Sequence, residues 1–268
     1  MNFHLFASNA AVTIIAMTAL WLVSVKLKDA SIIDPWWSLL FLAIAVRSAV
    51  DAPITPTKVA LLSCVAIWSL RLSLHLFVRS IGKPEDPRYA QFRKKYGPSR
   101  YWWVSLFQVF WLQGALALFI SLPLQVAASS AIQRSIGISD IIGIGLFVIG
   151  FGIESVADHQ LARFRRDPTH RGRVLDAGLW RFSRHPNYFG EALLWWGFWC
   201  FAISENFGWA TIVAPALMTF LLVRVSGVTM LDAHLLATKP QYADYIRRTS
   251  GFIPMPVSMT HLSTGGRK

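Results

Sequence analysis

Seven long apolar segments, separated by short and strongly basic segments, constrain this chain more than any other feature. The apolar segments are roughly 12 to 25 residues long, and a helix needs about 20 residues to cross the hydrocarbon core of a bilayer. A single span must also satisfy its backbone hydrogen bonds internally, which makes it helical. The sequence therefore predicts an all-α, polytopic membrane protein with a seven-transmembrane-helix bundle. The expected spans are Ala10–Val25, Pro35–Val50, Val59–Val78, Trp102–Val126, Ile141–Ala157, Ala192–Ile203 and Trp209–Val228.

Composition agrees with a membrane bundle. Hydrophobic residues make up 54% of the chain and charged residues 15%, whereas a soluble domain usually carries about 25% charge. A net charge of +12 in a soluble protein would suggest a nucleic-acid partner. Here the basic residues flank apolar segments, so we expect a lipid membrane and no nucleic acid. Cys64 and Cys200 lie within apolar segments, and we expect neither disulfides nor a metal site.

The placement of Lys and Arg predicts the orientation, because cytoplasmic loops carry an excess of both. With the N-terminus outside, the inner segments hold 21 basic residues and the outer segments and adjoining helix ends hold three. We therefore expect the N-terminus out and the C-terminus in, in a bacterial inner membrane with the site facing the cytoplasm. No linker divides the single membrane domain, residues 1–268. Within it we expect substrate-side helices in 1–130, cofactor-binding helices and loops in 131–258, and a flexible tail in 259–268.

Ionisable side chains within apolar segments are costly, and each is a candidate for function. Arg71 and His75 are four residues apart and share one helix face. Glu154 and Asp158 form a second such pair, followed by the arginine-rich segment 163–166. Carboxylates suit ribose hydroxyls and Arg suits phosphates, although charge alone favours a helix-end ion-pair network for this second set.

The most informative motif runs from Gly178 to Glu191, with the sequence Gly-Leu-Trp-Arg-Phe-Ser-Arg-His-Pro-Asn-Tyr-Phe-Gly-Glu. Pro186 suits the first turn of a helix, and Asn187 is a capping type. Gly190 permits close approach of a backbone or a ligand. Helix capping alone does not require so many polar residue types in succession, so the motif indicates a binding site.

This motif resembles the signature of the steroid 5α-reductase-like membrane proteins, most closely their bacterial branch, much of which is catalogued as a domain of unknown function. The similarity extends from about Asp34 to Pro254 and includes the segments 34–37, 85–89 and 252–254. It implies a seven-helix bundle that binds NADPH and reduces an activated carbon–carbon double bond, an enone. The implied substrate is an apolar molecule from the bilayer, such as a steroid, an isoprenoid or a lipid, and no obligate protein partner is inferred.

The resemblance also assigns cofactor contacts, position by position. We expect NADPH rather than NADH, because the arginines of segment 163–173 offer more positive charge than one pyrophosphate needs. Glu154 stands where steroid reductases often have Asn. The matching contacts are Arg71, Lys83, Asp158, Arg165, Arg173, Asn187 and Glu191. From the same motifs and basic segments we add Glu154, Arg166, Arg181, Tyr188, Tyr245 and Arg248.

The substrate half departs from the family pattern. Steroid 5α-reductases hold the substrate ketone with a Gln-Glu pair and a third-helix Tyr, but this chain has no Gln-Glu dipeptide, and Trp68 occupies the Tyr position. Another donor must then meet the carbonyl oxygen. Trp68 offers an indole N–H, His75 can also give up a proton, and Asp34 can if burial keeps it protonated. A turn or cap role for Asp34 and an interfacial role for His75 are the structural alternatives.

Two other classes of function compete with a reductase. Arg-His-Pro-x-Tyr also occurs in membrane isoprenylcysteine methyltransferases, which bind S-adenosylmethionine. That ligand has no phosphates, so the basic segment 163–173 and the Gly-Glu pair of the motif favour the reductase. A transporter or lipid-binding protein would accommodate buried charges, but it does not explain why the polar residues gather at one membrane face.

Overall fold

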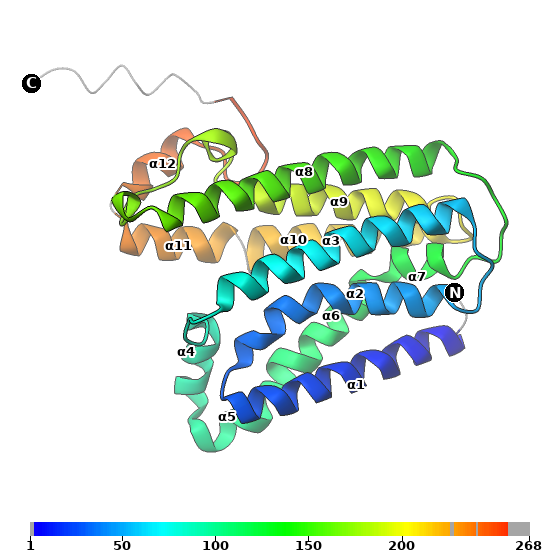
Figure 1. The fold of residues 1–268 in the computed structure, drawn as a ribbon, viewed down its shortest axis with the longest axis horizontal. Helices are drawn as coiled ribbons and strands as arrows, with labels where there is room; N and C mark the ends of the chain where they lie inside the picture. Colours follow the sequence, from blue (N-terminus) through cyan, green and yellow to red (C-terminus); the bar gives the residue numbers. More distant parts are fainter. Residues whose placement is uncertain (1–2, 226–227, 240, 257–268) are drawn as a thin grey trace, which may run out of the picture. The chain divides into compact units, whose positions relative to one another are not determined.

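The computed structural model describes residues 3–225, 228–239 and 241–256, and the regular elements in these ranges are all helices (Figure 1). Six helical stretches there are long and apolar enough to cross a membrane, as expected for a polytopic membrane protein. The tail expected at 259–268 lies outside the described residues. The six stretches are Phe3–Leu27, Ala30–Ala49, Pro56–Ser80, Pro98–Ile120, Ile138–Arg166 and Gly208–Val225.

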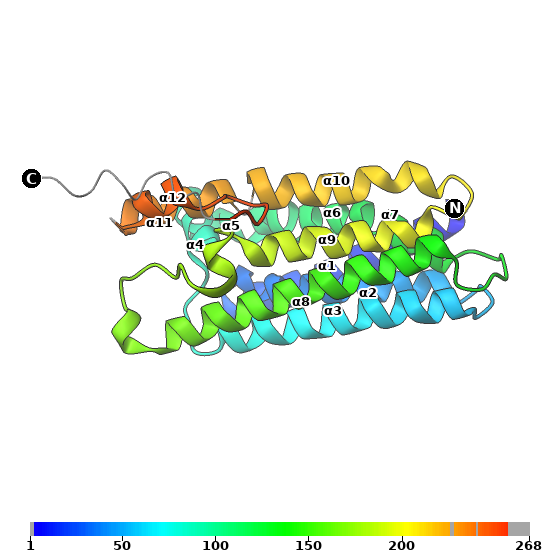
Figure 2. The same cartoon turned by 90° about the horizontal axis from the view of Figure 1, so that it is seen from above.

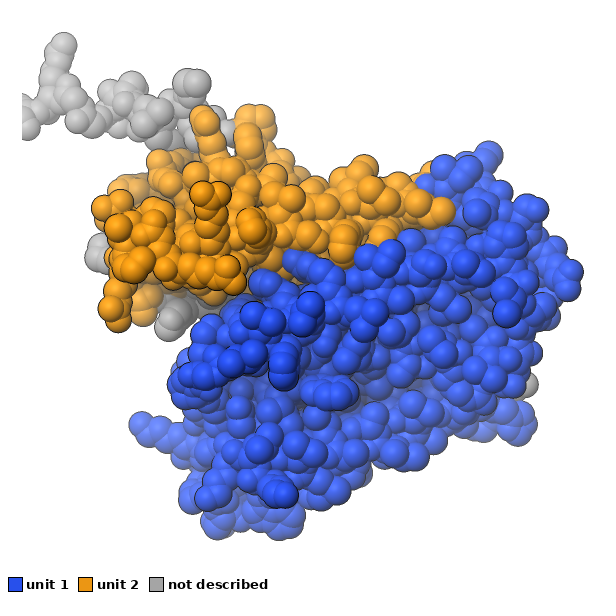
Figure 3. All heavy atoms as spheres, viewed as in Figure 1, with its two compact units in different colours: residues 1–141, 198–214 blue, residues 142–197, 215–268 orange. Residues whose placement is uncertain are grey.

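The chain divides into two compact units, which Figure 3 shows in different colours. Unit 1 contains residues 1–141 and 198–214, and unit 2 contains residues 142–197 and 215–268. The boundary lies beyond residue 130, where the sequence suggested a change from substrate-side to cofactor-side helices. Unit 1 also includes residues 198–214, and no feature of the sequence distinguishes this segment from the residues of unit 2 on either side of it.

Unit 1 is built on a layer in which α1, α2 and α3 run side by side (Figures 1 and 2). α2 also packs against α7, and α1 also packs against α6. Large aromatic side chains fill the core between them, among them Phe41, Trp68 and Phe110, each with 0% exposure. The helices of this unit are α1 Phe3–Leu27, α2 Ile33–Ala49, α3 Pro56–Ser80, α4 Pro87–Tyr96, α5 Pro98–Ser105, α6 Leu112–Ile120 and α7 Leu122–Ala128.

The apolar run expected as one span over Trp102–Val126 is divided into α5, α6 and α7. A π-helical segment, Leu106–Trp111, connects α5 to α6. The continuous stretch then ends at Ile120, and Pro123 lies in the first turn of α7. Proline lacks a backbone N–H, and its ring clashes with the carbonyl of the preceding helical turn. It therefore starts a new helix here instead of continuing the old one.

Unit 2 contains most of α8 and α9, together with the C-terminal helices. α8 continues past the apolar run that ends at Ala157, because the Gln, Leu, Ala and Arg residues of segment 158–166 are good helix formers. α9 begins at Pro186 instead of Ala192, since proline fits the first helical position. The helices are α8 Ile138–Arg166, α9 Pro186–Ala202, α10 Val213–Phe220, α11 Val228–Thr238 and α12 Tyr242–Arg248.

Candidate functional site

Glycines bring α8 and α9 into close backbone contact within unit 2. A Cβ atom on Gly190 would lie 2.5 Å from the carbonyl oxygen of Gly150, and one on Gly150 would lie 2.5 Å from the carbonyl oxygen of Gly190. Seven residues further along α9, a Cβ on Gly197 would lie 2.7 Å from the carbonyl oxygen of Gly143. Small residues at such positions let membrane helices approach closely, and here they fix the register of α8 against α9.

This register places Asn187, at the start of α9, beside Asp158 on α8. The amide Nδ2 of Asn187 donates to Asp158 Oδ1 at 3.1 Å, so the amide oxygen Oδ1 faces elsewhere. That oxygen is buried and has no hydrogen-bond partner in the described part of the chain. Glu154 lies one turn before Asp158 on α8 and is 2% exposed. Two of the predicted carboxylates and the predicted amide are therefore close together.

The segment that precedes α9 folds back onto α8. Gly178 has a positive φ of 62°, which favours glycine, and a Cβ atom there would lie 2.5 Å from the side chain of Gln160. The Gln160 side chain accepts from the backbone N–H of Leu179 at 3.0 Å. Trp180 donates its indole N–H to the Ala157 carbonyl at 3.1 Å. The first half of the Gly178–Glu191 motif is thus anchored on α8.

A carboxylate on α11, Asp232, anchors the second half of the motif. Arg184 donates to Asp232 Oδ2 through Nη2 at 2.8 Å and through Nε at 3.2 Å. His185 Nε2 lies 2.9 Å from Asp232 Oδ1. The phenol of Tyr242, on α12, donates to the same oxygen. One carboxylate therefore joins the motif to both C-terminal helices.

The chain after α12 also holds this segment in place. Arg184 donates to the carbonyl oxygen of Thr249 at 2.6 Å, and its backbone N–H donates to Ser250 at 2.8 Å. Ser183 Oγ donates to the Phe252 carbonyl at 2.8 Å. The result is a rigid turn immediately before α9, positioned by residues 48 to 69 positions away in the sequence.

Asp232 remains ionised in this arrangement. Burial alone would raise its pKa, but hydrogen bonds from His185, Arg184 and Tyr242 outweigh burial and hold the pKa at about 2. The same contact and burial raise the pKa of Tyr242 above its usual value. At neutral pH the cluster therefore consists of a carboxylate, a guanidinium, a neutral phenol and the imidazole.

The other ring nitrogen of His185 is available for a ligand. His185 is 1% exposed and stacks on Tyr188, with ring centroids 5.5 Å apart and planes 3° apart. Its Nδ1 atom is buried and has no hydrogen-bond partner in the ranges that the structure describes. Because Asp232 fixes Nε2 as a donor, Nδ1 is an acceptor in the neutral ring and a donor in the imidazolium.

The predicted arginines of unit 2 lie on its surface. The side chains of Arg165, Arg166 and Arg173 are exposed; the first two lie in the last turn of α8 and the third in the loop after it. Lys239 donates to the Arg173 carbonyl at 2.5 Å, which ties that loop to α11. Of the remaining predicted residues of this unit, Arg181 is exposed and Arg248 pairs with Asp176. Tyr245 is buried and donates to the Trp180 carbonyl. Tyr188 and Glu191 are half-buried.

The other predicted site residues belong to unit 1. Trp68 is completely buried and packs against Phe41, with ring centroids 5.8 Å apart. Arg71 and His75 follow it on α3 and are half-buried, while Lys83 lies in the exposed turn after α3. A joint role for these residues and the residues of unit 2 stays a prediction from the sequence.

Asp34 has a defined structural role in unit 1. Its Oδ2 accepts from Arg88 Nη2 at 2.7 Å, and its Oδ1 accepts from the Tyr89 hydroxyl at 2.7 Å. Glu85, in the loop before α4, accepts from the backbone N–H of Ala30 at 2.8 Å and from Arg93 at 2.8 Å. Asp34 therefore fastens the first turn of α4 to the start of α2, and Glu85 fastens the loop before α4 to the turn that precedes α2.

Sequence reasoning missed Asp232 and Tyr242, and it treated Arg184 and His185 only as parts of a motif. Asp232 has a signal in the sequence, since it is an acidic residue directly after an apolar run, a position that is costly unless the residue is paired. Arg184, His185 and Tyr242 carry no comparable signal, because they contact Asp232 only once α11 and α12 pack against the motif.

The fold and the site together define a polytopic membrane protein whose regular elements are all helices in the described residues, with a polar cluster at the start of one helix. Residues 20–249 match the family described as "Protein of unknown function (DUF1295)". The chain therefore belongs to this family. It is also similar to an uncharacterized protein of Schizosaccharomyces pombe, with 27% identity over 94% of this chain and 80% of that protein. No solved structure matches.

Proposed function

We propose that the protein is an NADPH-dependent membrane reductase that acts on an activated carbon–carbon double bond of an apolar substrate. The observation that carries the proposal is the pair of buried polar atoms without a partner among the described residues, Nδ1 of His185 and Oδ1 of Asn187. They belong to residues two positions apart at the start of α9. Buried polar groups are normally satisfied, so this pair is suited to a ligand with both donors and acceptors.

The residues of unit 2 fit a dinucleotide. An amide oxygen such as Asn187 Oδ1 accepts from a carboxamide or hydroxyl donor, and the carboxylates of Asp158 and Glu154 suit ribose hydroxyls. The exposed arginines Arg165 and Arg173 suit phosphates, which guanidinium groups bind through two parallel hydrogen bonds. When bound, NADPH would supply the hydride, and these residues would hold and orient it.

In the proposed reaction, a hydride adds to the β carbon of an enone, a proton adds to the α carbon, and NADPH becomes NADP⁺. Negative charge develops on the carbonyl oxygen, and a hydrogen-bond donor must stabilise it there. His75 of unit 1 is the candidate donor predicted from the sequence, because a protonated imidazole can both donate a hydrogen bond and release a proton. A steroid, an isoprenoid or an unsaturated lipid fits this chemistry.

We infer further that α9 is the seventh span, although its 17 residues make it shorter than the six stretches above. Seven spans place the two termini on opposite sides of the membrane. The excess of Lys and Arg then places the N-terminus outside and the Gly178–Glu191 motif on the cytoplasmic side, where NADPH is available.

Titration of the purified protein with NADPH, NADH and S-adenosylmethionine tests the function directly. We expect NADPH to bind about 10- to 150-fold more tightly than NADH, because one additional Arg–phosphate contact contributes roughly 1.5–3 kcal/mol. Arg173→Gln should reduce that preference, whereas Asn187→Ala should weaken both dinucleotides equally. Arg247→Gln is the control, because Arg247 is an exposed arginine of the same unit that pairs with Asp244.

Two outcomes contradict the proposal. Equal affinity for NADH and NADPH would remove the assignment of a 2′-phosphate contact. Binding of S-adenosylmethionine without binding of either dinucleotide would replace the reductase by a methyltransferase, the class that shares the Arg-His-Pro-x-Tyr pattern.

A further inference from the structure

Unit 1 has a partly open cavity of about 470 Å³ that no part of the proposed reaction uses. It lies where α1 begins and where α2 and α7 end. Its volume falls within the range of about 300–1,000 Å³ that is usual for small-molecule sites. No residue of the predicted cofactor set lines it. The polar residues that line it include Arg47, Ser48, Asp51, Ser129, Ser130 and Glu205.

Both signs of charge face this cavity. Arg47 Nη1 lies 2.9 Å from Asp51 Oδ2, and the two side chains are 33% and 75% exposed. Glu205 pairs with Arg134 at 3.2 Å, and its side chain is 7% exposed. One guanidinium and two carboxylates therefore line the cavity, together with the imidazole of His4, and Arg134 pairs with the carboxylate of Glu205. A ligand with both charges matches this lining better than a simple anion or cation does.

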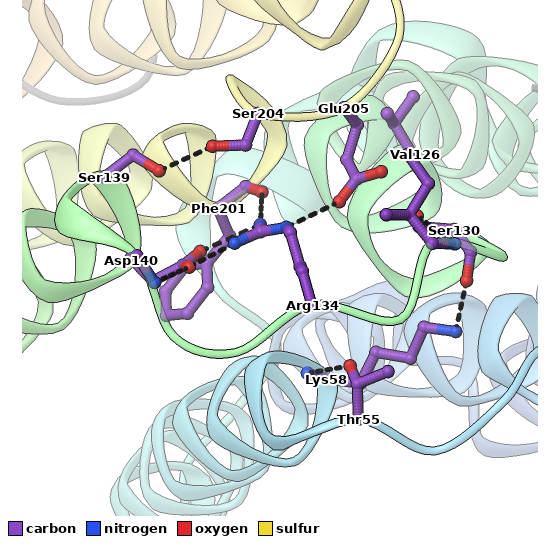
Figure 4. A network of polar contacts seen from close by, with 12 residues as sticks. Thr55, Lys58, Val126, Ser130, Arg134, Ser139, Asp140, Phe201, Ser204 and Glu205 are labelled. Atoms are coloured by element: carbon purple, nitrogen blue, oxygen red, sulfur yellow. Dashed lines mark hydrogen bonds and ion pairs between the residues drawn. The ribbon is translucent and has the colours of Figure 1, made fainter.

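The far wall of the cavity is held rigidly (Figure 4). Arg134, which pairs with Glu205, also donates to Asp140 and to the Phe201 carbonyl at 3.3 Å. Ser130 is held from the other side, since Lys58 Nζ donates to its carbonyl oxygen at 2.5 Å. Asp140 is 0% exposed and Lys58 is 4% exposed. Buried charges of this kind are expensive unless they are paired, and here they fix the positions of two residues that line the cavity.

Exposed apolar side chains lie in the lining of the cavity or next to it in the sequence. Phe3 is 79% exposed, Val50 is 67% exposed and Ile132 is 48% exposed, and all three are next to lining residues or line the cavity themselves. Phe3 begins one apolar stretch and Val50 directly follows another, where the hydrocarbon of a bilayer gives way to its polar headgroups, and Ile132 lies in the loop between two further stretches. Polar and exposed apolar side chains side by side suit an amphipathic ligand.

We propose that this cavity binds the headgroup of phosphatidylethanolamine, with the phosphate on Arg47 and the primary ammonium on Asp51 and Glu205. A guanidinium matches a phosphate, and carboxylates accept hydrogen bonds from a primary ammonium. Among the described residues, the imidazole of His4 is the one aromatic ring in the lining, and no Phe, Tyr or Trp joins it. Quaternary ammonium groups are typically held by aromatic cages, so the lining favours the primary amine of ethanolamine over choline.

Native mass spectrometry of the detergent-purified protein with added phosphatidylethanolamine, phosphatidylcholine or phosphatidylglycerol tests this. We expect one phosphatidylethanolamine per chain, bound roughly tenfold more tightly than either of the other lipids, because neither of them has an ammonium that donates hydrogen bonds to the carboxylates. Arg47→Gln and Asp51→Asn should each reduce that affinity by about tenfold, since each removes one charged partner of the headgroup. Arg100→Gln, an exposed arginine on α5 that does not line the cavity, should leave it unchanged.

The other outcomes overturn the proposal. Equal binding of phosphatidylcholine removes the amine assignment, and tighter binding of phosphatidylglycerol makes the cavity an anion site. If soluble phosphoethanolamine binds as tightly as the lipid, the ligand is a soluble zwitterion. If Arg47→Gln lowers the helical circular dichroism, the decision rests on Asp51→Asn. The Asp51 side chain is 75% exposed and pairs with Arg47 at the surface, so this change leaves the core intact.

Discussion

Replacing Gly150 by Ala should separate α8 from α9, and replacing Gly152 should not. The two glycines lie two positions apart on one helix and differ in what faces them. A Cβ atom at Gly150 would lie 2.5 Å from the Gly190 carbonyl oxygen and 2.7 Å from the Leu194 nitrogen, whereas nothing lies within 4 Å of a Cβ at Gly152. The atoms that oppose Gly150 belong to the backbone, so no side chain can rotate away to make room.

The magnitude follows from these distances. Ordinary contact begins at 3.4 Å, so the helices must move apart by about 1 Å, and overpacking of this kind costs about 1–3 kcal/mol. Alanine recovers roughly 0.5–1 kcal/mol of helix propensity at either position. Gly150→Ala should therefore destabilise the protein by about 1–2 kcal/mol, whereas Gly152→Ala should stabilise it slightly.

Thermal unfolding of both variants in the same detergent measures the difference. A change of about 1 kcal/mol shifts Tm by roughly 2–4 °C for chains of this size, so the two variants should differ by about 5–10 °C. Gly150→Ala should also weaken dinucleotide binding, because the movement pulls Asn187 away from Asp158. If Gly150→Ala melts at or above the temperature of Gly152→Ala, the close backbone contact between α8 and α9 does not exist.

Three other predictions concern Asp232, the orientation of the chain and the proton donor. Asp232→Asn should cost roughly 2 kcal/mol or more at neutral pH, because it leaves Arg184 without a counter-charge and removes a carboxylate acceptor from His185. Since the folded pKa of Asp232 lies below its usual value, at about 2, the stabilisation is complete above pH ~4 and is lost as the pH falls towards 2. The free energy of unfolding, measured from pH 6 to 2, should therefore fall more steeply with decreasing pH in the wild type than in the variant. A cysteine placed at His170 should resist an impermeant thiol reagent added to intact cells, and its modification from outside would reverse the predicted orientation. With an identified substrate, His75→Ala should slow hydride transfer in stopped-flow NADPH oxidation, and a rate near that of the wild type would remove His75 as the acid.

The membrane class was predictable from the sequence because it depends on local properties. Apolar length and the spacing of Lys and Arg are visible in a single segment, and they located all six stretches that are long enough to span. The ends of the helices were less predictable. α8 continues to Arg166 because charged residues do not stop a helix, and the run from Trp102 is divided at Ser121 and Pro123, whose effect depends on the neighbouring turn.

The polar cluster was only partly predictable for a different reason. The Gly178–Glu191 motif is recognisable from its unusual series of polar residues, and one of them, Asn187, contacts Asp158. Asp232 meets Arg184 across 48 positions of sequence, and neither helical periodicity nor spacing relates the two. Only the return of α11 and α12 to the motif brings the carboxylate to the arginine and the histidine.

Asp34 shows how a contact in the structure bears on a catalytic assignment made from sequence. Arg88 donates to one oxygen of this carboxylate and Tyr89 donates to the other. These contacts give Asp34 a structural role beside any catalytic one. Burial and the neighbouring Asp34 charge also raise the pKa of Tyr89, so the phenol keeps its proton and remains the donor. Asp34→Asn would therefore loosen the contact between α2 and α4 whether or not Asp34 takes part in catalysis. A slower reaction in that variant would not identify the acid, whereas a loss of rate without a loss of stability in His75→Ala would.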